Sequence, residues 1–150
     1  MPPEPARIAV IADTHDKLPL KLVELLSGAD EIWHLGDVCG EWVLDRLRAG
    51  GKPVRVVRGN CDPVADWPLT LDLNRAGLRI RLVHIPPPSP PPEVDLLLHG
   101  HTHVPRHERE GSTLFLNPGC ITRPNQGAPR SYAWLMLYAN GEYRWELRTF

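Results

Sequence analysis

The chain of 150 residues lacks several features that would place it in a special class of protein. Its only cysteines are Cys39, Cys61 and Cys120, with no Cys-x-x-Cys pair, so the sequence predicts a reduced protein without a disulfide framework. No apolar run approaches the roughly 18 residues of a membrane span, and the first residues lack the apolar h-region of a signal peptide. We therefore expect a cytoplasmic protein with no membrane association.

The chain also lacks a large excess of charge of either sign, since its formal net charge is -1. This balance disfavours a broad electrostatic surface for nucleic acid and leaves open a local basic patch. An apolar content of 42% and a charged content of 23% are ordinary for a globular protein. At this length a chain buries about 70% of its unfolded surface, and we expect a single domain over residues 1–150.

The first part of the chain repeats a pattern of apolar strand, polar loop and helix. Strands are expected at 7–12, 31–35 and 54–57, and helices at 18–26 and 42–47. The helix at 18–26 would place Leu18, Leu22, Leu25 and Leu26 on one face. Strands that alternate with helices indicate βαβ units and a parallel sheet.

The later chain alternates apolar and polar residues, which is typical of hairpins. We expect pairs of strands at 69–73 with 78–83, at 106–109 with 113–117, and at 131–138 with 142–148. The first of these pairs would turn at 74–77. After the first pair comes a proline run at 86–92, which excludes a helix or central strand there and predicts exposed polyproline II.

A histidine-rich segment directly follows the apolar run at 94–98, which we interpret as a buried strand. On extended backbone His101 and His103 would leave from the same face, and Gly100 would let the chain turn or be closely approached. Neutral imidazole is the commonest metal ligand, so the pair indicates a metal site. The alternative is a hairpin edge with solvated histidines.

Polar side chains follow five of the expected strands, where parallel strands would bring them to one edge. They are Asp13, His15, Asp37, Asn60, His84, His101 and His103. Imidazole, carboxylate and amide ligands suit Mn, Fe, Zn, Ni or Co better than Ca or Mg. Each residue alone has a structural alternative: Asp13 or Asp62 as a helix cap, Asn60 in a left-handed turn, His84 in the core. Their joint position at strand ends favours the metal site.

Five spaced motifs, over roughly residues 7–148, resemble the calcineurin-like metallophosphoesterases. They are Asp13-x-His15, Gly36-Asp37, Gly59-Asn60-Cys61-Asp62, His84 and Gly100-His101-Thr102-His103, and Asn117-Pro118-Gly119 also fits. The similarity is greatest to the small phosphodiesterases of the YfcE type, whose fold is shared with Vps29. The resemblance implies an α/β fold of four layers, a metallophosphoesterase sandwich with two mixed β-sheets flanked by helices.

The resemblance also implies a centre of two divalent metal ions. One ion would take Asp13, His15, Asp37 and His103, and the other would take Asp37, Asn60, His84 and His101, so that Asp37 bridges. Two metals generate a bridging hydroxide that attacks phosphorus in line. The residues expected to take part in catalysis are Asp37, Asn60, Cys61 and His84. Mn²⁺ is the expected metal, with Ni²⁺, Fe²⁺, Co²⁺ or Zn²⁺ as alternatives.

The chain departs from the family pattern at two places. Many relatives carry histidine at the position of Cys61, and a thiol with a pKa near 8.5 is a poor acid for an alkoxide leaving group. After His84 the chain continues with Ile85 and the proline run, too short a connection for a helical crossover. We expect this loop to lie beside the site.

These observations predict a metal-dependent phosphoesterase, acting on phosphodiesters rather than phosphomonoesters. The expected partner is a small phosphodiester or phosphate-ester substrate; nucleic acid is disfavoured, and a homo-oligomer is left open. Arg58 and Arg123 are candidates for contact with an anionic substrate. The alternative function is a Vps29-like interaction scaffold that no longer catalyses. All seven ligand positions are filled, which favours the enzyme.

Overall fold

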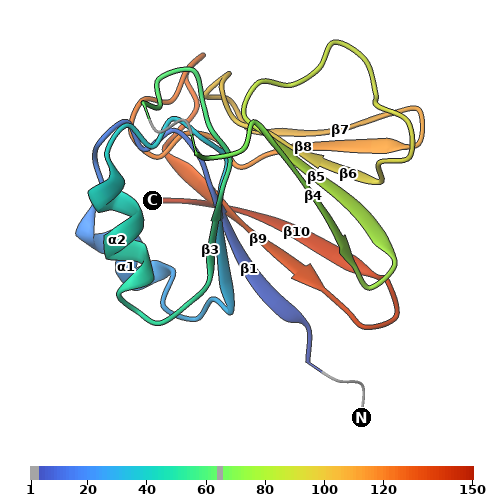
Figure 1. Cartoon of the computed structure of the whole chain (residues 1–150), viewed down its shortest axis with the longest axis horizontal. Helices are drawn as coiled ribbons and strands as arrows, with labels where there is room; N and C mark the ends of the chain where they lie inside the picture. The colour runs from blue at the N-terminus through green and yellow to red at the C-terminus, as the bar shows by residue number, and fades with distance from the viewer. Residues whose placement is uncertain (1–3, 64–65) are drawn as a thin grey trace.

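The computed structural model describes residues 4–63 and 66–150, in which the strands form two five-stranded sheets (Figure 1). The first sheet has the order β10-β9-β1-β2-β3. Its strands are β1 (Ala6–Ile11), β2 (Glu31–His34), β3 (Val54–Val56), β9 (Ser131–Leu137) and β10 (Tyr143–Thr149). The first three are parallel to one another, and β9 and β10 are antiparallel to their neighbours. The expected βαβ units are therefore confirmed.

The second sheet has the order β4-β5-β6-β8-β7. Its strands are β4 (Thr70–Arg75), β5 (Leu78–Val83), β6 (Leu96–Leu98), β7 (Arg106–Glu110) and β8 (Thr113–Asn117). β6 lies between β5 and β8 and is parallel to both. This central place on the sheet explains why all three leucines of β6 are buried. The strand expected before the histidine segment is confirmed.

The two sheets face each other across the main hydrophobic core. Ile8 and Val10 of β1 belong to the same buried cluster as Leu82 of β5 and Leu98 of β6. Burying such a side chain contributes about 1.5–3 kcal/mol, so this interface is a major source of stability. It also fixes how the ends of the strands of one sheet lie relative to those of the other.

Both helices cover the outer face of the first sheet. They are α1 (Leu20–Leu25) and α2 (Glu41–Arg48), and they bury Leu22 and Leu44 against that sheet. The first helix is shorter than expected and begins only after Pro19, whose backbone is extended. The expected apolar face is wrong at Leu25, which is 37% exposed.

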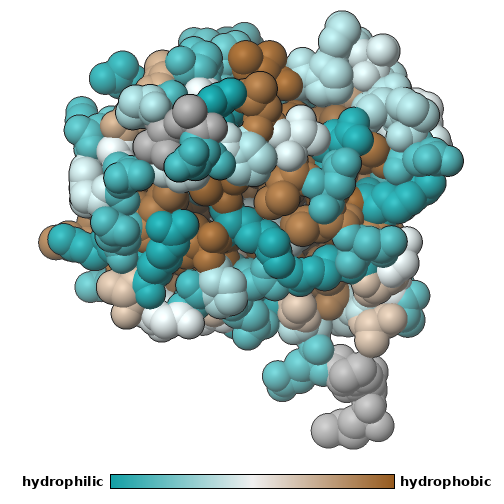
Figure 2. Space-filling model, viewed as in Figure 1, coloured by the Kyte–Doolittle hydropathy of each residue, from teal (hydrophilic) through white to brown (hydrophobic). Residues whose placement is uncertain are grey.

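The fold class is confirmed, with one difference in its outermost layer. Among the described residues no helix covers the second sheet, whose outer face carries a small cluster of Val94, Leu97 and Phe115. The connection 84–95 leads from β5 to β6 and contains no helix, because it is short and its prolines lack the N–H that a helix interior needs. None of the described helices is long and apolar enough to cross a membrane. Figure 2 shows hydrophilic side chains over most of the viewed face, with apolar residues between them.

The first hairpin turns more tightly than the sequence indicated. The expected turn covered 74–77, but β4 continues to Arg75 and pairs with Leu78. The turn consists of Ala76 and Gly77, with φ values of 53° and 81°. Two positive φ values suit the twist of a two-residue hairpin, and alanine is an uncommon residue there. This is why the sequence pattern did not locate it.

Candidate metal centre

The polar residues that follow the strands come together where the two sheets meet. Asp13 and His15 follow β1, Asp37 follows β2 and Asn60 follows β3, all from the first sheet. His84 follows β5, and His101 and His103 follow β6, from the second sheet. The expectation of one edge of one parallel sheet is therefore wrong. The packing of the two sheets, rather than strand pairing, brings the two groups together.

Two carboxylates lie among three histidines at this junction. Asp13 Oδ1 is 3.4 Å from Nε2 of His103 and 3.8 Å from Nε2 of both His15 and His84. Asp37 Oδ2 is 3.2 Å from Nε2 of His84 and 3.9 Å from Nε2 of His15. The Nε2 atoms of His15 and His103 are 3.2 Å apart. Five of the seven predicted ligands are thus in direct contact.

The orientation of two histidine rings follows from their other nitrogen. Nδ1 of His84 donates to the carbonyl of Leu35 at 2.8 Å, and Nδ1 of His103 donates to the carbonyl of Arg123 at 2.7 Å. In the neutral ring each Nε2 therefore carries a lone pair, and it points at a carboxylate. Backbone carbonyls are common partners of metal-binding histidines, and they fix the same tautomer.

Two atoms in this cluster are buried and have no hydrogen-bond partner, namely Asp13 Oδ1 and His84 Nε2. A buried acceptor without a donor is costly, and natural proteins rarely leave one. Here acceptors face acceptors, so a positive charge between them relieves the repulsion. This group of oxygen and nitrogen atoms therefore fits a bound cation, because Mn, Fe, Zn, Ni and Co accept such ligands.

The pKa values show the same demand for positive charge. Burial raises the pKa of Asp13 from 3.8 to about 6, although His84 and His103 act to lower it. Burial also acts to raise the pKa of Asp37, but the neighbouring His84 ring and the hydrogen bond from the N–H of Cys61 outweigh it and hold the pKa below its usual range. Burial acts to lower the pKa of His84, but the carboxylates of Asp37 and Asp13 outweigh this effect, so the pKa is raised.

The other two predicted ligands lie at the rim of the cluster. The His101 ring packs edge-on against that of His84, with centroids 5.2 Å apart. The backbone N–H of His101 donates to Asp13 Oδ2 at 3.2 Å. Asn60 is exposed, and its amide nitrogen lies 3.8 Å from Sγ of Cys61. The expected extended backbone at His101 and His103 is wrong, because their φ values are 75° and 61°.

Known proteins match this chain over most of its length. The model of the calcineurin-like phosphoesterase superfamily domain matches residues 7–140. The chain belongs to this superfamily. Phosphodiesterase YfcE of Escherichia coli (strain K12) is 31% identical over an alignment 159 positions long that covers 86% of each chain. The probable metallophosphoesterase MJ0623 of Methanocaldococcus jannaschii is 33% identical over 78% of this chain and 69% of the relative.

Two solved structures illustrate the range of proteins that share this fold. Escherichia coli YfcE, described as a phosphoesterase, aligns with a TM-score of 0.74 and 26% identity over 91% of this chain and 96% of its own. Vacuolar protein sorting 29 from Cryptosporidium parvum aligns with a TM-score of 0.76 and 23% identity over 99% of both chains. The second likeness concerns the fold alone.

Strained backbone occurs at several predicted ligand positions of this calcineurin-like domain. Asp13, His15 and Asp37 have φ values of 59°, 49° and 57°. Residues other than glycine adopt such values at a cost of order 1–3 kcal/mol each, and they concentrate at functional sites. Together with His101 and His103, five of the seven predicted ligands are held in this conformation.

Close backbone approach explains two glycines of the motifs. A Cβ at Gly59 would lie 2.2 Å from Oδ1 of Asp37 and 2.4 Å from its backbone nitrogen. A Cβ at Gly100 would lie 2.9 Å from Oδ2 of Asp13. The close approach expected at Gly100 is therefore observed. Both glycines leave room for the carboxylates at the centre of the cluster.

Asp62 ties together the loops that follow β2 and β3. Its carboxylate accepts hydrogen bonds from the N–H groups of Gly59 at 2.7 Å, Cys39 at 2.8 Å and Asp37 at 2.9 Å. The alternative of a helix cap is wrong, since these donors belong to loops. Its place next to Asn60 and Cys61 was visible in the sequence, but its partners were not. We regard Asp62 as a positioning residue.

Buried polar side chains support the loops beneath the ligands. Nδ1 of His34 accepts from the N–H of Gly36 at 3.1 Å, so its Nε2 donates to Thr14 Oγ1 at 3.0 Å. Burial lowers the pKa of His34 to about 3, and that ring is neutral. Asn117 donates to the carbonyl of Gly100 at 3.3 Å. His34 is fully buried beneath the ligand loops.

The cysteines have different surroundings. Cys61 is exposed, and Cys39 is half-buried with Sγ 3.8 Å from Nδ1 of His15. Burial, together with Cys61 and nearby carboxylates, raises the pKa of Cys39 to about 12. Burial and Asp37 also raise the pKa of Cys61. No spacing rule links Cys39 to His15, so their contact has no signal in the sequence.

A cavity of about 490 Å³ opens beside the cluster. Asn60 and His84 line it together with Arg58 and the exposed apolar residues Leu69 and Ile85. This volume lies within the range of small-molecule sites. The connection after His84 thus borders the site, as expected. Arg123 is exposed, and its carbonyl holds His103.

Proposed function

We propose that this calcineurin-like domain is a binuclear metal-dependent phosphodiesterase, and that residues 1–150 act as one domain. One metal would be held by Asp13, His15, Asp37 and His103. The second would be held by Asp37, Asn60, His84 and His101. Mn²⁺ is the proposed metal, with Ni²⁺, Fe²⁺, Co²⁺ and Zn²⁺ as alternatives.

The observation that carries this proposal is the cluster of acceptors between the two sheets. Asp13 Oδ1 and His84 Nε2 are buried without hydrogen-bond partners, and carboxylate oxygens face imidazole lone pairs at 3.2–3.8 Å. A pair of bound metals would supply a nucleophile at neutral pH and neutralise charge on the phosphoryl oxygens. Membership of a phosphoesterase superfamily supports the same reaction class.

The protein's own groups would bind and orient the substrate. The cavity beside Asn60 and His84 would receive one ester group, and Arg58 in its lining offers a cation for phosphate. Cys61 offers no effective acid at neutral pH, because burial and Asp37 raise the pKa of its thiol. We therefore propose a preference for good leaving groups. The name of the relative YfcE, a phosphodiesterase at 31% identity, supports diesters over monoesters.

The test is hydrolysis of bis(p-nitrophenyl) phosphate by protein stripped with chelator and reloaded with Mn²⁺. The wild type is compared with Asp37→Asn, which removes the proposed bridging charge. Asp45→Asn on the exposed face of α2 is the matched control. Metal-dependent turnover in the wild type and the control, and none in Asp37→Asn, supports the proposal.

Turnover retained in Asp37→Asn would contradict the bridging role. A folded protein that shows no turnover with Mn, Ni, Co, Fe or Zn would contradict the enzyme itself. That result would favour the scaffold alternative, for which the fold likeness to vacuolar protein sorting 29 is the relevant observation.

A further inference from the structure

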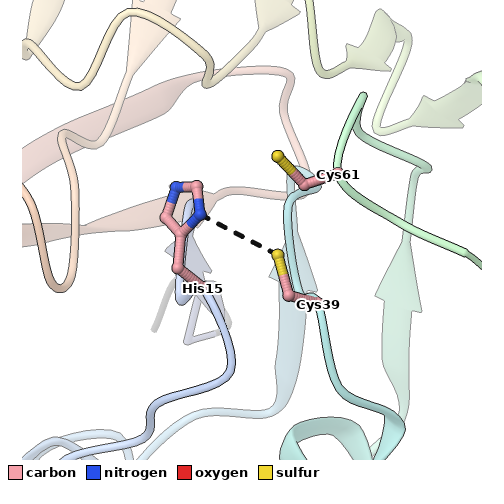
Figure 3. Close-up of side chains that lie close together, drawn as sticks. All are labelled: His15, Cys39 and Cys61. Atoms are coloured by element: carbon pink, nitrogen blue, oxygen red, sulfur yellow. Dashed lines mark hydrogen bonds between the residues drawn. The ribbon is translucent and has the colours of Figure 1, made fainter.

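A second group of atoms that could hold a metal ion lies at the Nδ1 side of the His15 ring. His15, Cys39 and Cys61 come from the loops that follow β1, β2 and β3. Their ligand atoms all lie within 4.8 Å of one another, and Nδ1 of His15 is 3.8 Å from Sγ of Cys39. Figure 3 shows the three side chains around one common space.

The positions of both thiols are fixed by hydrogen bonds of their own backbone. The N–H of Cys39 donates to Asp62 Oδ1 at 2.8 Å, and the N–H of Cys61 donates to Asp37 Oδ1 at 2.9 Å. These bonds hold the two loops in register, so the thiols are brought together before any ligand arrives. The same two carboxylates give the surroundings a negative charge, which favours a cation.

We propose that His15 Nδ1, Cys39 Sγ and Cys61 Sγ form a site for a thiophilic divalent cation such as Zn²⁺ or Cd²⁺. Thiolate and imidazole ligands select soft or borderline metals, unlike the cluster of carboxylates and imidazoles on the other side of His15, which contains no thiolate. Tetrahedral zinc with ordinary bond lengths separates a sulfur from a nitrogen ligand by about 3.5 Å. The observed 3.8 Å between Cys39 and His15 needs little change.

Binding replaces two protons by one metal ion. Each thiol releases its proton to solvent, and the two S–H bonds give way to two metal–sulfur bonds, with no change of oxidation state. Cys61 is exposed, so ions can reach its thiol from solvent, whereas Cys39 is half-buried. The fourth position of the ion stays open to water, as in metal sites with three protein ligands.

His15 links this thiol site to the proposed binuclear centre. Its Nε2 faces Asp13 and His103, while its Nδ1 faces Cys39. An ion at the thiol site competes for the ring, so excess Zn²⁺ or Cd²⁺ is expected to inhibit hydrolysis by the Mn²⁺-loaded protein. Binding at the thiol site itself does not depend on hydrolysis, so the two proposals can fail separately.

The experiment is a titration of reduced, metal-free protein with Cd²⁺, followed by the ultraviolet charge-transfer band of thiolate bound to cadmium. The wild type is compared with Cys39→Ser, Cys61→Ser and the double variant. Cys120→Ser is the matched control, because Cys120 is the remaining thiol and lies near Asp13 and His103. Asp13→Asn tests independence from the binuclear centre, with its fold checked by circular dichroism.

We expect the band in the wild type, Cys120→Ser and Asp13→Asn, a weaker band in each single variant, and none in the double variant. The double variant should also bind one cadmium ion fewer. A band that persists in the double variant, or that disappears in Cys120→Ser, would overturn the proposal. Loss of hydrolysis in Asp13→Asn with an intact band would leave the thiol site supported.

Discussion

Oδ2 of Asp37 lies 3.2 Å from Nε2 of His84, although the first residue follows a strand of one sheet and the second follows a strand of the other. The other ring nitrogen of His84, Nδ1, donates to the carbonyl of Leu35. Leu35 follows β2, as Asp37 does. The loop after β2 therefore both orients the imidazole and supplies its carboxylate partner. The proposed centre is thus part of the contact between the two sheets.

Removal of Asn60 is expected to weaken mainly the second proposed metal. Asn60 lies at the rim and is not in direct contact with Asp13 or His103, so Asn60→Ala should leave the first metal bound. Loss of an outer partner of a metal ligand already costs about 10–100-fold in affinity, so loss of a ligand should cost at least as much. Metal content measured after gel filtration should fall from two ions to one; an unchanged content would contradict the assignment.

Replacement of Gly59 by alanine should disrupt the centre through sterics alone. The added Cβ would meet Oδ1 and the backbone nitrogen of Asp37, which cannot both move without breaking the loop. We expect a loss of about 3 kcal/mol or more in the free energy of unfolding, together with weaker metal binding. Gly50→Ala is the control, since its Cβ would find its nearest neighbour 4.0 Å away. Equal stability of the two variants in urea would refute this account.

Asp62→Ala should loosen the loops that follow β2 and β3. Three N–H groups would lose their charged acceptor, and we expect a destabilisation of about 3 kcal/mol after partial compensation by water. Asp62→Asn should cost less, because one oxygen remains to accept. The exposed control Asp45→Ala should change stability by no more than about 0.5 kcal/mol. Urea unfolding and metal titration of the variants measure both consequences, and a neutral Asp62→Ala would show that water replaces the carboxylate fully.

Ionisation of Asp13 should destabilise the metal-free protein as pH rises from about 4 to about 6, opposite in sign to the contribution of the buried neutral His34. The pKa of Asp13 is raised to about 6 from 3.8, so the folded state holds this proton more tightly than the unfolded state does. Ionisation of the buried carboxyl then costs the folded state up to about 3 kcal/mol. Urea unfolding in chelator should show that the wild type loses stability relative to Asp13→Asn across this pH range. Identical slopes in the two proteins would contradict the prediction, and added Mn²⁺ should restore stability to the wild type.

Cys61→Ser should leave hydrolysis of an activated aryl diester within about tenfold of the wild type, because a thiol whose pKa is raised is not a useful acid at neutral pH. The measurement is kcat/KM for bis(p-nitrophenyl) phosphate, with a dialkyl diester for comparison. A far larger loss with the serine variant would show that the thiol takes part in the reaction.

The sequence by itself determined the elements and the list of candidate ligands. Apolar runs such as 7–12 and 94–98 predicted the buried strands, because burial on both faces leaves no room for polar side chains. Polar residues directly after those runs identified Asp13, Asp37, Asn60 and His84, since chain order alone shows where a strand ends. The spacing of the motifs added the resemblance to the family and the fold class.

Only the tertiary structure decided how those residues meet. The packing of two sheets places His84 against Asp37, and it depends on contacts between residues far apart in the chain. The roles of Asp62 and Cys39 depend on hydrogen bonds and distances across loops, for which no local pattern exists. The spacing of His101 and His103 indicated extended backbone, but both residues are left-handed in the structure. The fold holds them in this conformation against their local preference.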